Sequence, residues 1–65
     1  MSTGARLKVA REKVGLTLQH VADVAAVDLR TYQRFEADER LPRVDVAIKI
    51  AAALGVTVEK LFGEK

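Results

Sequence analysis

The chain has 65 residues, of which 49% are hydrophobic and 31% charged, and this is the composition of one small globular domain. The sequence contains no cysteine, which excludes disulfides, thiolate metal sites and cysteine nucleophiles, and its single histidine, His20, argues against a metal cluster. Residues 1–34 carry six basic and three acidic side chains (+3), whereas residues 35–65 carry five and six (−1). This asymmetry permits a polyanionic partner without demonstrating one.

The longest apolar run, residues 50–56, is far too short to span a bilayer, and the first residues lack the pattern of a secretory signal. We therefore expect a cytoplasmic protein that does not associate with a membrane.

Two short helices are predicted first. Apolar residues recur at helical spacing ahead of Gly15, which stands where a capping glycine belongs, and this predicts a helix over 4–13. Thr17 suits an N-cap, since its hydroxyl can accept a hydrogen bond from a free amide of the first turn, and a second helix over 18–25 follows. The two apolar patterns consist of Leu7, Ala10 and Val14, and of Leu18, Val21, Ala22 and Ala25.

A third helix follows after a short link. Asp28 suits its N-cap, and Tyr32 and Phe35 share one face of a helix over 29–37. Only about three residues separate it from the second helix, and so short a link forces a sharp angle between the two.

The last two helices follow a loop over 37–43, where Pro42 lacks a backbone donor and disfavours helix before it. Apolar residues at helical spacing predict a helix over 44–54, which Gly55 ends. Thr57 suits an N-cap, with Val56 and Leu61 as an apolar pair around it, and this predicts a last helix over 58–62. No β alternation of useful length is present.

These elements predict an all-α, compact five-helix domain that occupies residues 1–65 as a single unit. Ten of its apolar residues are alanine, so the core is expected to be thin. The predicted core members are Leu7, Ala10, Val14, Leu18, Val21, Ala22, Tyr32, Phe35, Ile48, Ala51, Leu54 and Leu61.

The sequence lacks the common motifs of enzyme active sites. The sequence has no glycine-rich phosphate loop, no zinc-binding histidine pair and no nucleophile elbow. His20 falls in the first turn of the second predicted helix, either as an ordinary exposed residue or as a contact to a backbone phosphate. We expect no enzymatic activity, no cofactor and no metal site.

The third predicted helix carries an unusually basic face. Arg30, Gln33 and Arg34 share this face directly after the tight turn, and arginine and glutamine make bidentate contacts to guanine and adenine edges in a major groove. The other interpretation is a solvated surface helix with two arginines.

A longer set of residues resembles a known family. In chain order the set comprises Gly15-Leu16-Thr17, Val21-Ala22, the run Thr31-Tyr32-x-Arg34-Phe35-Glu36, Pro42, and Ala51 with Ala53-Leu54-Gly55-Val56. In this register the chain resembles the phage-repressor or Cro-type helix-turn-helix family, also called XRE, from about Ala5 to Phe62. The resemblance implies a lambda-repressor-like DNA-binding fold with its helix-turn-helix at about residues 17–37.

Three positions depart from the family's pattern. Ala26 stands at the turn, where the family usually has glycine, and a positive φ there would cost an alanine roughly 1 kcal/mol or more. The family often has a phosphate-binding glutamine where this chain has Leu18, so that Gln19 is displaced by one residue. Arg43 replaces the usual Ser or Thr cap of the fourth helix.

The resemblance also implies DNA contacts residue by residue. The positions that match base-reading residues are Leu29, Arg30 and Gln33, of which Arg30 is the best candidate for a guanine contact. The positions that match phosphate-facing residues are Thr31, Arg34 and Arg43, to which the start of the second helix adds Thr17 and Gln19.

Two charges fall on predicted inward faces. Arg11 lies on the apolar stripe of the first helix, and Glu36 lies beside the aromatic residues of the third. An isolated buried charge is very costly, so inward charges are normally paired, and the resemblance matches these positions to an Arg–Glu bridge. We expect direct contact between the two side chains.

The fourth and fifth helices carry apolar residues beyond the predicted core. Leftover apolar patches mark interfaces, and we expect a homodimer through these helices, unless Ile50 and Phe62 pack inward against the first helix. The predicted interface residues are Val46, Ile50, Val58 and Phe62.

Together these features imply a sequence-specific transcriptional regulator that binds double-stranded DNA. We expect a repressor or autoregulator that binds a palindromic operator as a homodimer. Two alternatives stay open. One is a restriction-modification controller or antitoxin-like regulator, the latter with a protein partner; the other is a protein-interaction module of the same fold that has lost DNA binding.

Overall fold

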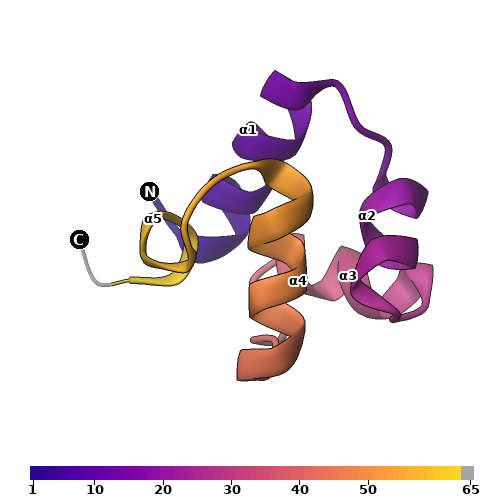
Figure 1. Cartoon of the computed structure of the whole chain (residues 1–65). Coiled ribbons are helices and arrows are strands. Elements are labelled where there is room, and N and C mark those ends of the chain that lie inside the picture. Colours follow the sequence, from indigo (N-terminus) through magenta and orange to yellow (C-terminus); the bar gives the residue numbers. More distant parts are fainter. Residues whose placement is uncertain (64–65) are drawn as a thin grey trace.

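Five helices joined by short links form the protein (Figure 1). The structure is a computed structural model that describes residues 1–63, and these residues contain no strand. The helices are α1 (Thr3–Val14), α2 (Leu18–Ala25), α3 (Leu29–Glu36), α4 (Val44–Leu54) and α5 (Val58–Phe62). All five begin and end within one residue of the predicted bounds, and the predicted all-α class is confirmed.

Helix α4 lies at the centre of the fold. It packs mainly against α2 and also contacts α1 and α5, while α3 packs against α1 and α2. Figure 1 shows α2 and α3 on one side of α4 and α5 on the other. The domain measures 27 × 23 × 19 Å, so every helix is close to solvent on at least one face.

A small set of large side chains forms the centre of the core. Leu7, Val21, Tyr32 and Ile50 are fully buried, and each comes from a different helix. Phe35 meets Tyr32 edge to face, with ring centroids 6.1 Å apart, in the geometry that aromatic pairs prefer. Most of the other buried core residues are alanines, which let the short helices approach closely.

The predicted inward face of α4 is wrong at Ile48, which is 54% exposed, whereas Ile50 is fully buried. The buried residues of α4 follow helical spacing from Ala47, through Ile50 and Ala51, to Leu54. Nearly every position of α4 is apolar, so periodicity alone allowed two faces. Packing against the other helices selected between them.

Val14 was also predicted to be buried, and this is wrong because its side chain is 52% exposed. It is the last residue of α1, and Figure 1 shows that end of α1 extending past the end of α4.

Helix starts are capped largely as the sequence predicts. The Thr17 hydroxyl accepts a hydrogen bond from the His20 amide at 3.0 Å, and the Thr57 hydroxyl accepts from the Lys60 amide at 3.1 Å. Asp28 occupies the N-cap position of α3, but its side chain makes no capping hydrogen bond.

An ion pair joins α1 to α3. The Arg11 Nε donates to Oε2 of Glu36 at 2.8 Å and the Arg11 Nη2 donates to Oε1 at 3.3 Å, with only 11% and 9% of the two side chains exposed. The Arg11 Nη1 also donates to the Leu16 carbonyl at 3.0 Å, so the same guanidinium holds the link to α2. The predicted contact between Arg11 and Glu36 is present.

Charge and burial at this ion pair shift the pKa values of Arg11 and of the adjacent Tyr32. The hydrogen bond that Arg11 donates to the Glu36 carboxylate raises the pKa of Arg11. Burial raises the pKa of Tyr32 far above its ordinary value, and the Glu36 carboxylate adds to the effect. The tyrosine therefore stays neutral beside the ion pair.

A second connection between α1 and the end of α3 gave no signal in the sequence. The Gly4 amide donates to Oδ1 of Asp38 at 2.8 Å, and a Cβ at Gly4 would overlap the backbone carbonyl oxygen of Glu36. The Ser2 hydroxyl and then the Gly4 amide lower the pKa of Asp38. This contact anchors the first residues of the loop that leads to α4.

The turn between α2 and α3 is built on Ala26. Its φ of 60° and ψ of 40° are left-handed, as its place in the family pattern predicted, and its amide donates back to the last turn of α2. An alanine in this conformation stores strain that a glycine would avoid.

We predict that Ala26→Gly raises the free energy of unfolding by about 0.5–1 kcal/mol, because glycine adopts the left-handed conformation without strain. Urea unfolding followed by circular dichroism would measure the change. Ala52→Gly, at an exposed position within α4, should instead lower the free energy of unfolding by about 1 kcal/mol. A loss of stability in both variants would contradict the strain at Ala26.

We also predict that Glu36→Leu lowers the free energy of unfolding by about 3 kcal/mol, because it leaves the Arg11 charge unpaired and largely buried. The double variant Arg11→Met with Glu36→Leu should recover much of this loss, since no unpaired charge remains. The matched control is Lys49→Met, an exposed residue of α4, which should change stability by less than about 0.5 kcal/mol. Additive losses in the double variant would exclude the coupling.

Candidate nucleic-acid interface

Helix α3 has two distinct faces. Tyr32 and Phe35 are buried and fix the helix on α1 and α2, while Arg30, Gln33 and Arg34 are exposed. This division follows from helical periodicity, because residues three and four apart share a face. The polar residues of α3 are therefore presented by a rigid helix with an anchored back.

The exposed residues of α3 border a shallow hollow. Arg30, Gln33 and Arg34 line it together with Ala37 and Glu39, and Glu39 is its one acidic member among the residues that the structure describes. Two guanidinium groups and one amide provide many hydrogen-bond donors at this surface. Such a surface suits acceptor-rich partners such as base edges and phosphates.

Leu29 and Thr31, the other predicted contacts of α3, are half-buried. They lie in the first turn of the helix, directly after the α2–α3 turn. They flank Arg30 in the sequence, but they do not line the hollow that Arg30, Gln33 and Arg34 border.

The start of α2 offers a donor at Thr17. Its hydroxyl oxygen accepts from the His20 amide, which leaves the hydroxyl hydrogen free to donate outward. The side-chain amide of Gln19 instead donates to Oδ1 of Asp23 at 2.9 Å, within the same helix. A phosphate would therefore compete with a carboxylate for Gln19, which makes Thr17 the better candidate of the two.

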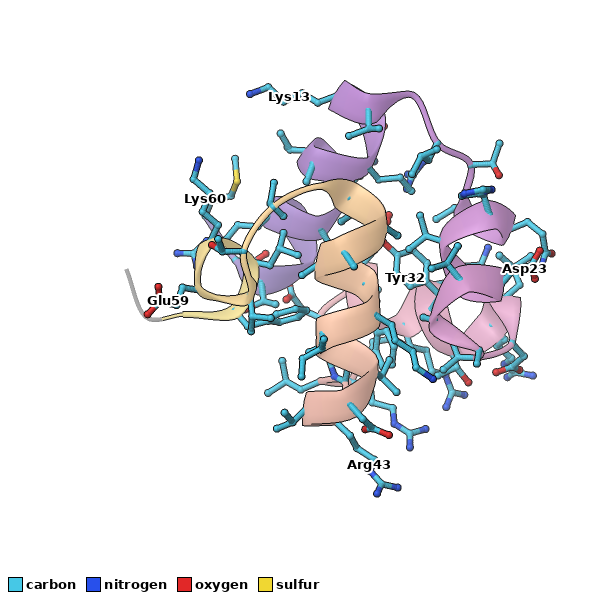
Figure 2. All side chains as sticks on the ribbon, viewed as in Figure 1. Lys13, Asp23, Tyr32, Arg43, Glu59 and Lys60 are labelled. Carbon is cyan, nitrogen blue, oxygen red and sulfur yellow. The ribbon has the colours of Figure 1, made fainter. Side chains whose placement is uncertain are left out.

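Arg43 projects into solvent from the start of α4 (Figure 2). Its side chain is 86% exposed, and its Nε lies 3.9 Å from Oδ1 of Asp45, whose side chain is 69% exposed. Such an exposed pair contributes little, so the guanidinium is free to rearrange toward another anion. Arg40, in the preceding loop, is also exposed, and no pattern in the sequence had singled it out.

The predicted dimer interface is wrong at Ile50, which is fully buried within the core and cannot contact a second copy. Val46 and Phe62 are partly buried against that core, and Val58 is 37% exposed. The error has the same cause as that in the core of α4, namely the choice between two apolar faces. The apolar side chains that α4 presents to solvent are Val44, at 76% exposed, and Ile48.

Two other kinds of feature, metal centres and membrane-spanning helices, are absent from residues 1–63. These residues contain no group of three or more histidine, aspartate or glutamate side chains placed to hold a metal ion. None of the helices within this range has the length and apolar character needed to cross a bilayer.

A family model described as helix-turn-helix matches residues 7–61, from the first buried leucine of α1 to the buried leucine of α5. The chain belongs to the helix-turn-helix family of the phage-repressor type. The match covers α2 and α3 together with the α1, α4 and α5 segments that support them. The family membership that the sequence motifs indicated is thus confirmed.

Curated relatives cover nearly the whole chain. The cryptic phage CTXphi transcriptional repressor RstR of Vibrio cholerae is 32% identical over 63 residues, which are 97% of this chain and 56% of that protein. The HTH-type transcriptional regulator ImmR of Bacillus subtilis is 33% identical over 64 residues, 98% of this chain and 50% of that protein. The chain thus spans about half the length of these two relatives.

A third relative matches over a slightly shorter stretch of the chain. A putative HTH-type transcriptional regulatory protein of Methanocaldococcus jannaschii is 37% identical over 57 residues, 88% of this chain and 18% of that protein. No solved structure matches the chain significantly.

Proposed function

We propose that this protein is a sequence-specific DNA-binding transcriptional regulator that acts as a repressor or autoregulator. The observation that carries the proposal is the geometry of α3, whose aromatic face is buried and whose opposite face presents Arg30, Gln33 and Arg34. A helix anchored in this way after a tight turn can enter a major groove with its first turns at the base edges. The names of RstR and ImmR as transcriptional regulators support the same function.

We expect residues 29–33 of α3 to contact the bases. Arg30 is exposed and can donate two hydrogen bonds to O6 and N7 of guanine, and Gln33, one turn further along the same face, can pair with adenine. Leu29 has no polar side-chain atom, so it would contact a thymine methyl group.

Phosphate contacts would flank this readout. Arg34 and Arg43 carry exposed guanidinium groups, and Thr17 has a free hydroxyl hydrogen at the start of α2. Thr31 and Gln19 would make weaker contacts, since Thr31 is half-buried and Gln19 is bonded to Asp23. These groups would set the position of the domain on the duplex without reading its sequence.

A single domain neutralises few phosphates, so we propose that the protein binds a palindromic operator as a homodimer. Two linked copies gain affinity because the second half-site is bound at high effective concentration. The surface for pairing consists of apolar residues that α4 and α5 expose, namely Val44, Ile48 and Val58, with Phe62 beside them. This surface replaces the predicted one that included Ile50.

Selection of bound duplexes from a random DNA pool tests the proposed function directly. We expect enrichment of one sequence in two inverted half-sites whose centres lie about one helical turn apart. Binding without any sequence enrichment would reduce the proposal to a non-specific DNA-binding protein. Absence of salt-sensitive binding to any duplex would refute it.

Substitutions should separate base readers from phosphate contacts. Arg30→Ala is expected to relax the preference at one base pair and to cost about 1–3 kcal/mol there, because it removes a bidentate contact. Arg34→Ala and Arg43→Ala should weaken binding to all duplexes alike and reduce the slope of log affinity against log salt by about one each. Fluorescence anisotropy with the selected site and a scrambled duplex measures both effects.

If Arg30→Ala weakens binding to the selected and the scrambled duplex equally, Arg30 contacts the DNA backbone and not a base. Lys49→Ala, outside the proposed DNA-binding residues, serves as the control and should leave both affinities within about twofold.

The proposed dimer surface is tested by charge insertion. Ile48→Glu and Val58→Glu should each shift the protein toward monomer in sedimentation velocity and weaken binding to a full palindrome about tenfold or more, with half-site binding unchanged. Both side chains are exposed, so the fold should tolerate the changes. If wild type stays monomeric at high concentration and both variants bind the palindrome normally, the interface lies elsewhere.

A further inference from the structure

A groove between α1 and α5 is left unused by the proposed DNA contacts. Arg6, Val9, Lys13 and Val14 of α1 line one wall, and Val56 and Lys60 line the other. In Figure 2, Lys13 and Lys60 project on the side of α1 and α5, whereas Asp23 of α2 projects on the opposite side of the molecule. None of the described residues that line the groove belongs to α3, so the groove is a surface distinct from the exposed face of that helix.

The floor of this groove is apolar and partly open. Val9 is 41% exposed and Val14 is 52% exposed, and beneath them lie Leu54 and Leu61, which belong to the core at 2% exposure each. An opening that reaches down to core leucines offers more contact area than an isolated surface valine. Exposed apolar surface with a polar rim is typical of an interaction site.

The rim of the groove is basic. Arg6 and Lys13 lie seven residues apart on α1, which places them two turns or about 10 Å from each other along the helix. Lys60 faces them from α5, and no carboxylate lies among the described residues that line the groove. The Arg6 Nη1 donates to the Gly63 carbonyl at 2.8 Å, which orients this guanidinium and leaves its other donors available.

We propose that this groove receives an acidic amphipathic helix of a partner protein. On α1, Arg6 and Lys13 are seven residues apart with Val9 between them. A partner helix that matches this wall carries two carboxylates seven residues apart. Its apolar side chains lie three and four residues after the first carboxylate. Its acids would pair with Arg6 and Lys13, and its apolar residues would cover Val9 and the leucines beneath. Such helix-in-groove binding uses the spacing that two adjacent helices share.

A lipid surface fits these observations less well. Peripheral membrane binding needs large side chains that reach into the bilayer, such as Trp, Phe or Leu, on a protruding face. Here the exposed apolar side chains that line the groove are Met1, Val9 and Val14, with no exposed aromatic residue or leucine among them, and the leucines lie recessed at its floor. A recessed apolar floor suits a ligand that inserts side chains into it.

Anisotropy with a synthetic peptide tests the proposal on the full chain. The probe is a labelled 16-residue helix with glutamate at two positions seven residues apart and leucine at the third and fourth positions between them. A peptide with lysine in place of glutamate and a peptide with a central proline are the matched controls. We expect saturable binding of the glutamate peptide only.

Charge reversal then locates the binding site. Lys13→Glu and Lys60→Glu should each weaken the glutamate peptide about fivefold, because an attractive contact becomes repulsive at an exposed position. Lys49→Glu, an exposed lysine outside the groove, should leave the affinity within about twofold. Circular dichroism confirms that each variant is folded, and Val14→Asp provides a second, apolar probe of the same groove.

Three outcomes would overturn the proposal. The first is equal affinity for the glutamate and lysine peptides, and the second is peptide binding that Lys13→Glu, Lys60→Glu and Val14→Asp leave unchanged. The third is absence of peptide binding together with binding to phosphatidylglycerol vesicles, or to random duplex DNA, that Lys13→Glu weakens. This third result would assign the groove to a lipid surface or to the DNA backbone. None of these results bears on sequence-specific binding by α3, so the two proposals are tested separately.

Discussion

The contact between Arg11 and Glu36 joins α3, the helix with the exposed basic face, to α1. One guanidinium holds the Glu36 carboxylate through two nitrogen atoms and the Leu16 carbonyl through its third, so it joins α1, α3 and the link into α2. Both side chains are about nine-tenths buried, so water cannot solvate either charge well if the pair separates. Helix α3 therefore has one favourable position relative to α1, which also sets the direction of Arg30 and Gln33.

The hydrophobic core that supports this arrangement contains few large side chains. Four large side chains, from α1, α2, α3 and α4, meet at the centre, and alanines fill much of the remaining contact area. Small residues let short helices approach closely, but they bury little apolar area and so contribute little stability each. Polar contacts at helix ends, such as the Asp38 carboxylate on the Gly4 amide, then matter more than they would in a larger domain.

The two sides of the molecule differ in what they present. Helix α3 presents guanidinium and amide groups around a shallow hollow, which suits base edges and phosphates. The groove between α1 and α5 presents lysines around a recessed apolar floor, which suits a ligand with both carboxylates and apolar side chains. A small domain can bind two partners when, as here, the two surfaces have no lining residue in common.

Local chemistry was sufficient to predict the helices and much of the site. The caps at Thr17 and Thr57, the glycines at 15 and 55 and the proline at 42 act within a few residues, so their effects are readable from the sequence. The strained Ala26 turn and the inward positions of Arg11 and Glu36 also follow from pattern, helped by a family resemblance. The basic face of α3 was readable because the arginines and glutamine alternate with Tyr32 and Phe35, which are strongly apolar.

Only the tertiary structure decided between equally apolar alternatives. Ile48 and Ile50 lie on different faces of a helix that is apolar nearly all round, and the packing of α2 on α4 buried Ile50 and exposed Ile48. The contact of Gly4 with Asp38 joins residues 34 apart in sequence, so no local pattern could indicate it. The groove likewise exists because α5 packs beside α1, which brings Lys60 opposite Arg6 and Lys13. The sequence by itself determined where the helices begin and end and which polar residues α3 carries, because those depend on neighbours along the chain; which faces meet depends on neighbours in space.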